Sequence, residues 1–157
     1  EELKKCEGQA VSLSLDLYDQ WKGMEKDGKW RFTSPTHVVL AFAQALEELK
    51  AEGGIAARNK RYAENNRMLI KKLEALGFRT YIPKELQGPF ITTFFYPENA
   101  KFTFGEMYAY IKERGYAIYP GKLTDAETFR LGNIGEIYLE DVEKIAGIFQ
   151  DFMNRKV

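Results

Sequence analysis

The sequence predicts an α/β fold of the α+β type, in which a short sheet carries helices on one face. From Gly54 onward, helical and strand patterns follow one another in the order helix, strand, strand, helix, strand, strand, helix. The expected strands are short and rich in aromatic and β-branched residues. Glycines and prolines separate these elements, so tight turns join them and the sheet is mixed or antiparallel.

In the N-terminal third of the chain the sequence predicts fewer helices and strands. Residues 11–18 (VSLSLDLY) alternate apolar with hydroxyl or acidic side chains, which is typical of a half-buried strand or an extended segment. Residues 22–29 are polar and contain two glycines, so we expect a loop there. Ser34 and Pro35 predict a helix start, because serine caps free N–H groups and proline suits the first helical position. That helix is amphipathic and ends at the double glycine 53–54.

The remaining elements follow the double glycine. They are expected, in chain order, as a helix at 55–75 closed by Gly77, strands at 78–82 and 90–96, a helix at 104–114, a strand at 116–119, a tight turn at Pro120-Gly121, a strand at 128–131 and a helix at 139–154. In the first of these helices the apolar residues share one face, and Arg61 is expected on the solvent side.

The double glycine also predicts a domain boundary. Residues 1–52 do not complete a sheet of their own, so we expect them to be the end of a larger domain that is incomplete here. Residues 53–157 are expected to form a C-terminal small domain. The chain opens with Glu1 and without a helix cap, which indicates a segment that continues from something upstream.

Charge and composition exclude several classes of function. Twenty-three basic and 23 acidic residues give a formal net charge of zero, whereas nucleic-acid and membrane-surface binders need concentrated positive charge. One cysteine and one histidine argue against a metal site. No apolar run is long enough to cross a bilayer. Cys6 has no partner for an internal disulfide, so the cytoplasm is the expected compartment.

Two short stretches are candidates for binding an anion. In the first, Thr33 and Ser34 stand directly before a helix N-terminus, where free N–H groups and the helix dipole suit a phosphate. In the second, strand alternation turns Arg130 away from the apolar face, and its planar fork matches a carboxylate or phosphonate. Simple helix capping and a solvated surface arginine are the structural alternatives, and the residues by themselves leave both open. They assign no role to Lys122 or His37.

Four segments resemble one known family, the 2-aminoethylphosphonate:pyruvate aminotransferases, which are class V members of the fold-type I pyridoxal-phosphate enzymes. The segments are SLSLDLYDQW (12–21), GKWRFTSPTHVVLAFAQALEEL (28–49), IYPGK (118–122) and FRLGNIGEIY (129–138). The similarity extends through nearly the whole chain, which identifies it as the C-terminal part of such an enzyme.

The resemblance implies a cofactor, pyridoxal 5'-phosphate, and a homodimer. Thr33 matches the family residue that binds the cofactor phosphate of the neighbouring subunit. Arg130 matches the arginine that holds the acidic group of the substrate. The family's cofactor-bearing lysine precedes all four segments and has no counterpart here. We therefore assign no catalytic residue, and expect the chain alone to be inactive and without bound cofactor.

The reaction implied for the complete enzyme takes the amino group from 2-aminoethylphosphonate and gives it to pyruvate. The products are phosphonoacetaldehyde and alanine, as in phosphonate catabolism. Two other readings remain at this point. One is a related class V aminotransferase of the alanine:glyoxylate or serine:pyruvate type. The other is a dimerisation or binding module without catalysis.

Overall fold

The computed structural model describes residues 1–98, 100–123 and 126–156. It divides the chain into two compact units, Glu1–Glu48 and Leu49–Val157. The units meet inside a helix, a little before the double glycine that predicted the boundary. In the described residues no helix has the length and apolar character that crossing a membrane requires.

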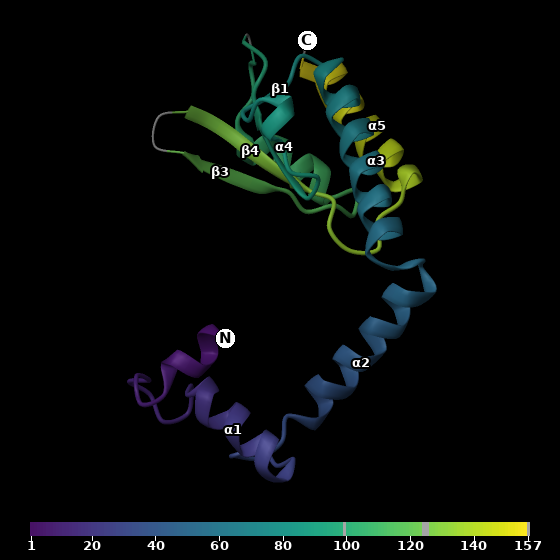
Figure 1. The fold of residues 1–157 in the computed structure, drawn as a ribbon. Helices are drawn as coiled ribbons and strands as arrows, with labels where there is room; N and C mark the ends of the chain where they lie inside the picture. Colours follow the sequence, from purple (N-terminus) through teal and green to yellow (C-terminus); the bar gives the residue numbers. More distant parts are fainter. Residues whose placement is uncertain (99, 124–125, 157) are drawn as a thin grey trace. The chain divides into compact units, whose positions relative to one another are not determined.

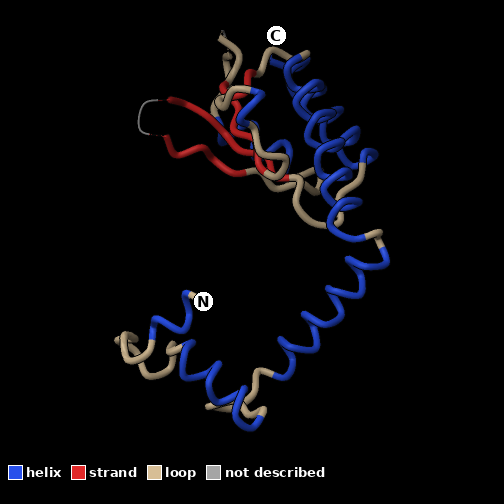
Figure 2. The backbone as a smooth tube through the Cα atoms, in the orientation of Figure 1, coloured by secondary structure: helices blue, strands red, loops and turns tan. Residues whose placement is uncertain are grey.

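The first unit contains no strand where the sequence predicts one, and it is helical through most of the predicted loop. It contains a short 3-10 helix, η1 (Glu2–Cys6), and helix α1 (Leu17–Asp27) (Figures 1 and 2). The loop predicted at 22–29 is therefore wrong, because α1 runs through most of it. The strand predicted at 11–18 is also wrong, since residues 11–16 form no strand and the last two residues belong to α1.

Local capping and the lack of a pairing strand explain this difference. Asp16 accepts a hydrogen bond from the backbone N–H of Asp19 at 3.0 Å, which caps the start of α1. Gly28 ends the helix in the left-handed conformation, with φ of 74°. The alternating Leu13 and Leu15 are both 77% exposed. Alternation by itself does not form a strand, because the backbone groups also need a partner strand.

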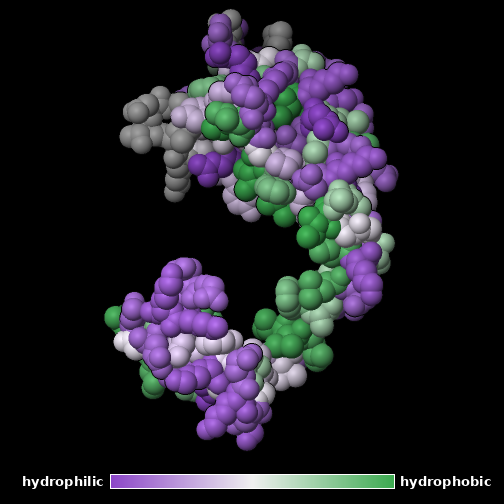
Figure 3. All heavy atoms as spheres, in the orientation of Figure 1, coloured by the Kyte–Doolittle hydropathy of each residue, from purple (hydrophilic) through white to green (hydrophobic). Residues whose placement is uncertain are grey.

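Helices α2 (Thr36–Ala51) and α3 (Gly54–Glu74) confirm two predictions. The double glycine separates them with φ of 106° at Gly53 and 81° at Gly54, a conformation that side chains oppose. Helix α2 begins one residue later than Ser34 and Pro35 suggest. Its predicted apolar face is present but has no cover in the described chain, because Phe42 is 63% exposed. Figure 3 shows the apolar colour along this helix.

The second unit contains an antiparallel sheet of four strands in the order β1-β2-β4-β3. The strands are β1 (Arg79–Thr80), β2 (Ile91–Phe95), β3 (Tyr119–Leu123) and β4 (Ala126–Gly132). Strands β1 and β2 lie within the predicted strands at 78–82 and 90–96, and β4 includes the predicted strand at 128–131. A short 3-10 helix, η2 (Lys84–Leu86), lies between β1 and β2.

Strand β3 corrects the prediction for residues 116–121. The predicted tight turn at Pro120-Gly121 is wrong, because both residues lie inside β3 and pair with β4. β3 is an edge strand, where the missing N–H of proline is tolerated. A Cβ atom at Gly121 would overlap the hydroxyl oxygen of Thr128 and lie 2.8 Å from its carbonyl carbon. Glycine is thus required by the close approach of β4 rather than by a turn.

All three helices of this unit pack on the same face of the sheet, as predicted. Helices α3, α4 (Phe104–Lys112) and α5 (Leu139–Lys156) supply one core together with Phe94 and Phe129 of the sheet (Figure 1). The rings of Phe94 and Phe129 face each other across β2 and β4 with their centres 5.6 Å apart. The opposite face of the sheet carries Arg130.

Candidate functional site

Arg130 lies in β4, on the sheet face opposite the helices. Its neighbours Phe129 and Leu131 are 0% and 4% exposed and belong to the core, whereas Arg130 is exposed. Strand alternation, which predicted this orientation, therefore holds in the structure. Within the described part of the chain no carboxylate forms a salt bridge with this guanidinium, so its donors are available to a ligand.

A groove of about 670 Å³ opens on this face. Arg130 lines it together with Tyr119, Ile91, Gly132 and Ile134. Among the described residues that line the groove, Arg130 supplies the one charged side chain. A guanidinium in a largely apolar groove binds a carboxylate or phosphonate more strongly than one in open water, because the two charges are less screened.

Buried asparagines hold the end of β4 that borders this groove. The side-chain amide of Asn133, which is 1% exposed, donates to the carbonyl oxygens of Pro89 at 2.9 Å and Tyr62 at 3.2 Å. Its Oδ1 accepts from Asn66 Nδ2 at 3.4 Å, and the same amide of Asn66 donates to Thr92 Oγ1 at 2.8 Å. These bonds connect the loop after β4 to α3 and to the chain before β2.

An ion-pair network fastens the same loop from the start of α3. Glu52 accepts hydrogen bonds from Arg58 at 2.6 Å and from Arg61 at 2.7 Å. Arg61 also donates to the carbonyl oxygens of Gly135 at 2.8 Å and Ile137 at 3.0 Å. The predicted solvent side for Arg61 is therefore wrong, because its side chain is only 16% exposed and crosses to the neighbouring loop.

The Glu52 network predicts a loss of stability in acid. Hydrogen bonds from Arg61 and Arg58 lower the pKa of Glu52 from 4.5 to about 2. The ionised carboxylate therefore contributes stability that is complete above pH 4.5 and is lost as the pH falls toward 2. We expect Glu52→Gln to lower the urea midpoint at pH 6, and the difference from the parent protein to shrink at pH 3. A constant difference at both pH values would contradict this assignment.

Thr33 lies in the first unit, so the structure places the two predicted site residues in different units. It is exposed, in the segment between α1 and α2. The preceding Arg31 anchors this segment to α1, because its backbone N–H donates to Gln20 Oε1 at 3.2 Å and its guanidinium to the Asp16 carbonyl at 3.1 Å. The N–H groups of the first turn of α2 lack carbonyl partners within the helix. Two of them have partners just before the helix, since the Thr36 N–H donates to the Ser34 carbonyl at 2.8 Å and the Val39 N–H to the Pro35 carbonyl at 3.0 Å.

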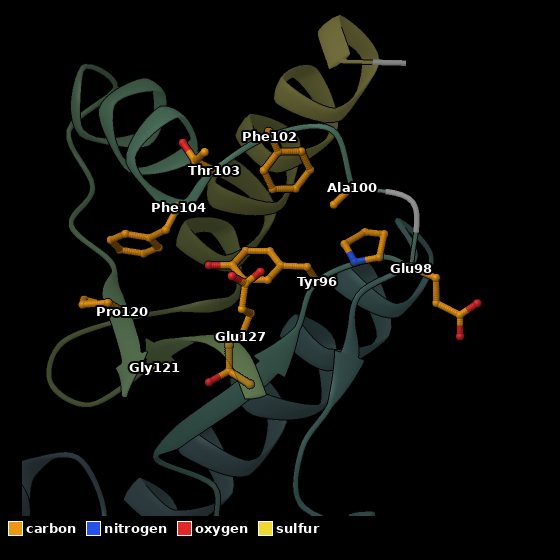
Figure 4. A pocket seen from close by; sticks show the side chains of 11 residues that line it. Tyr96, Glu98, Ala100, Phe102, Thr103, Phe104, Pro120, Gly121 and Glu127 are labelled. Carbon is orange, nitrogen blue, oxygen red and sulfur yellow. The ribbon is translucent and has the colours of Figure 1, made fainter. Parts of the chain in front are cut away.

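A second hollow, of about 490 Å³, lies near the β3–β4 end of the sheet and contains neither predicted site residue. Figure 4 shows the ring of Tyr96 and the carboxylate of Glu127 converging on it, with Phe102 and Phe104 alongside. Burial and the negative charge of Glu127 raise the pKa of Tyr96. This aromatic and acidic lining does not suit an anion.

The sequence analysis missed the asparagine network and the Glu52 pair. One signal was present, since the consecutive Asn65 and Asn66 fall inside a helical pattern, where asparagine is unfavourable without a specific partner. His37 is exposed, and the side chain of Lys122 lies outside the described part of the structure. The described residues contain no cluster of His, Cys, Asp and Glu that would bind a metal.

Known proteins resemble this chain in sequence. No protein-family model matches it. It is 57% identical over 151 residues to a 2-aminoethylphosphonate–pyruvate transaminase from Lysinibacillus sphaericus, covering 96% of this chain and 41% of the relative. It is 57% identical over 156 residues to a bifunctional phosphonoacetaldehyde hydrolase/aminoethylphosphonate transaminase from Clostridioides difficile, covering 99% of this chain and 24% of that protein.

The fold has counterparts among solved structures. An alanine–glyoxylate aminotransferase from Nostoc sp. matches with a TM-score of 0.78 and 19% identity, over 95% of this chain and 40% of that chain. This likeness concerns the fold alone. The sequence matches fall in the C-terminal part of the curated relatives, and the chain spans about two fifths of the Lysinibacillus protein. With 57% identity along almost its whole length, the chain is similar to the C-terminal part of 2-aminoethylphosphonate–pyruvate transaminases.

Proposed function

We propose that this chain is the C-terminal part of a pyridoxal-phosphate-dependent aminotransferase that converts 2-aminoethylphosphonate and pyruvate into phosphonoacetaldehyde and alanine. The observation that carries this proposal is the 57% identity to a protein named for that activity over 96% of the chain. The exposed guanidinium in a groove supports it, because both substrates present an acidic group. We place the reaction in the cytoplasm, where an exposed free thiol such as Cys6 stays reduced.

Arg130 is the residue that we propose holds the acidic group of each substrate in turn. Its two parallel N–H donors match the two oxygens of the pyruvate carboxylate, and they match two of the oxygens of the phosphonate. The bonds that hold Asn133 steady the end of β4 from the core side. A positioned fork orients the bound substrate, and orientation contributes a large part of the rate enhancement in such reactions.

Thr33 is the residue that we propose binds the cofactor phosphate of the neighbouring subunit in a homodimer. Its exposed hydroxyl precedes the N-terminus of α2, where the helix dipole favours a phosphate, so the residues present fit the cofactor. When bound, pyridoxal phosphate supplies the carbonyl that carries the amino group between substrates and a ring that withdraws electrons. The complete enzyme also needs a lysine to hold it, outside the four segments that carry the resemblance.

We further propose that residues 1–52 end the large domain and that residues 53–157 form the small domain. The division of the structure between Glu48 and Leu49 supports a boundary in this region. The uncovered apolar face of α2 is compatible with packing against a larger domain.

The two alternatives have less support. An alanine:glyoxylate or serine:pyruvate specificity shares the fold, but the fold is common to enzymes with different amino donors. A binding module without catalysis is compatible with the groove of Arg130, but the relatives of this chain are named for a transaminase activity. The sequence identity therefore favours the phosphonate donor.

A comparison of amino donors tests the proposed function. The complete protein should be supplied with pyridoxal phosphate, pyruvate and one donor at a time: 2-aminoethylphosphonate, or serine. Alanine should be assayed with glyoxylate in place of pyruvate. We expect 2-aminoethylphosphonate to give alanine and phosphonoacetaldehyde with a kcat/KM at least about tenfold above the other donors. Faster reaction with serine, or with alanine and glyoxylate, would transfer the protein to the alternative specificity.

A further inference from the structure

Four residues form a row across the exposed face of the sheet: Tyr81 just after β1, Thr93 in β2, Arg130 in β4 and Tyr119 in β3. The backbone N–H of Tyr81 donates to the carbonyl of Thr93 at 2.9 Å. Thr93 lies directly opposite Arg130 in the β2–β4 pair, and Tyr119 lies directly opposite Arg130 in the β3–β4 pair. Directly opposite residues in antiparallel strands project from the same face with their Cβ atoms roughly 5 Å apart. Tyr119 is therefore the immediate neighbour of Arg130 on the edge strand.

Tyr119 and Arg130 also line the same groove. Tyr119 is 67% exposed and projects from the opposite face to the core. The ring of Tyr119 does not contribute to the core of this unit, because the core is formed by phenylalanines on the other face of the sheet. A hydroxyl next to the guanidinium adds a neutral hydrogen-bond donor to a groove whose other described lining is apolar or backbone.

The chemistry of the two substrates differs at the group that Arg130 would hold. A carboxylate has two oxygens and one negative charge, so a single arginine fork satisfies it. A phosphonate, like a phosphate, has three acceptor oxygens and carries more than one negative charge near neutral pH. The two donors of the arginine fork bind two of these oxygens, so the third oxygen of the phosphonate has no donor from Arg130. A desolvated acceptor without a partner is costly, so a phosphonate site needs a further donor beside the arginine.

We propose that Tyr119 is a specificity-determining residue, whose hydroxyl donates to the phosphonate oxygen that the Arg130 fork leaves free. This inference rests on the proposed function and deepens it. Tyr119 then acts on the phosphonate substrate and contributes little when a carboxylate occupies the same place. Arg130 thus serves both half-reactions of the transaminase, whereas Tyr119 serves only the one in which the phosphonate is bound.

Substitution of Tyr119 by Phe in the complete enzyme tests the proposal. We expect kcat/KM for 2-aminoethylphosphonate to fall about 10- to 100-fold, the effect of losing one hydrogen bond to a charged group. We expect kcat/KM for pyruvate, and for alanine in the reverse direction, to change by less than about threefold. The melting temperature should stay the same, because the lost hydroxyl is exposed.

Tyr81→Phe is the matched control. It removes a hydroxyl from the same face, but the ring of Tyr81 packs beside Phe95 with centres 5.4 Å apart and does not line the groove. It should leave both substrates unaffected. An equal loss for phosphonate and carboxylate substrates in Tyr119→Phe, or no loss for either, overturns the role of Tyr119. If the unsubstituted enzyme does not use 2-aminoethylphosphonate, the proposed function itself fails, which separates the two results.

Discussion

Arg130→Ala in the complete enzyme is expected to lower kcat/KM about 100- to 1,000-fold for both 2-aminoethylphosphonate and pyruvate. The alanine leaves the acidic group of each substrate in the groove without its positive partner, and such truncations cost several kcal/mol. Cofactor binding should be nearly unchanged, because Arg130 and Thr33 belong to different units of the chain. Steady-state kinetics with each substrate, together with cofactor titration by absorbance, measure the two effects separately.

Arg79→Ala provides the control for this change. Arg79 lies on the same face of the sheet, opposite Phe95, but its guanidinium stacks over that ring at 5.5 Å and does not line the groove. It should alter kcat/KM by less than about twofold, as expected for a mostly exposed charge. If Arg130→Ala weakened cofactor retention as much as substrate use, the assigned role of Arg130 would be wrong.

Thr33→Ala gives the reciprocal result. Loss of one hydrogen bond to a charged phosphate should raise the cofactor dissociation constant about 10- to 100-fold, while KM for the substrates at saturating cofactor stays nearly constant. An unchanged dissociation constant would contradict the proposed phosphate contact.

Phe129→Ala is expected to cause the largest loss of stability, about 3–5 kcal/mol in the free energy of unfolding. Phe129 is 0% exposed, and its ring lies 5.4 Å from Phe78 and 5.8 Å from Phe149, centre to centre. The cavity would open where the sheet meets the helices, so it cannot be filled by a small shift of one side chain. Urea denaturation followed by far-ultraviolet circular dichroism measures the change.

Phe90→Ala is the matched control for that measurement. Phe90 is 47% exposed and makes one edge contact with Tyr62, at 5.7 Å between ring centres. Removing a half-exposed ring should cost about 1 kcal/mol. Similar losses for the two variants would show that Phe129 is not at the centre of the core.

Helix ends and the inner strands follow from local patterns in the sequence. Gly77 and Gly115 were recognisable as helix stops because only glycine adopts their positive φ values, 91° and 88°, without strain. The aromatic run at 90–96 indicates a strand, since its alternate residues reach the core. The outward direction of Arg130 follows from the same alternation.

The structures of β3 and of the first unit could not be predicted from local sequence patterns. Pro120-Gly121 reads as a turn unless the pairing with β4 is known, and pairing depends on residues that are separate in sequence. Residues 11–18 alternate as a strand does, yet the described chain has no strand to pair with them. In both places a long-range hydrogen-bond partner, present or missing, overrides the local pattern.

Residue order and type were sufficient to predict the fold class, the positions of most helices and the resemblance to a transaminase family. They also identified Thr33 and Arg130 as candidate anion ligands. Tertiary contacts were needed for the strand order, for the groove shared by Arg130 and Tyr119, and for the hydrogen bonds that Asn133 and Arg61 donate around the loop after β4. Periodicity reports which face of an element is apolar, but the neighbour that meets that face is chosen by packing between distant segments.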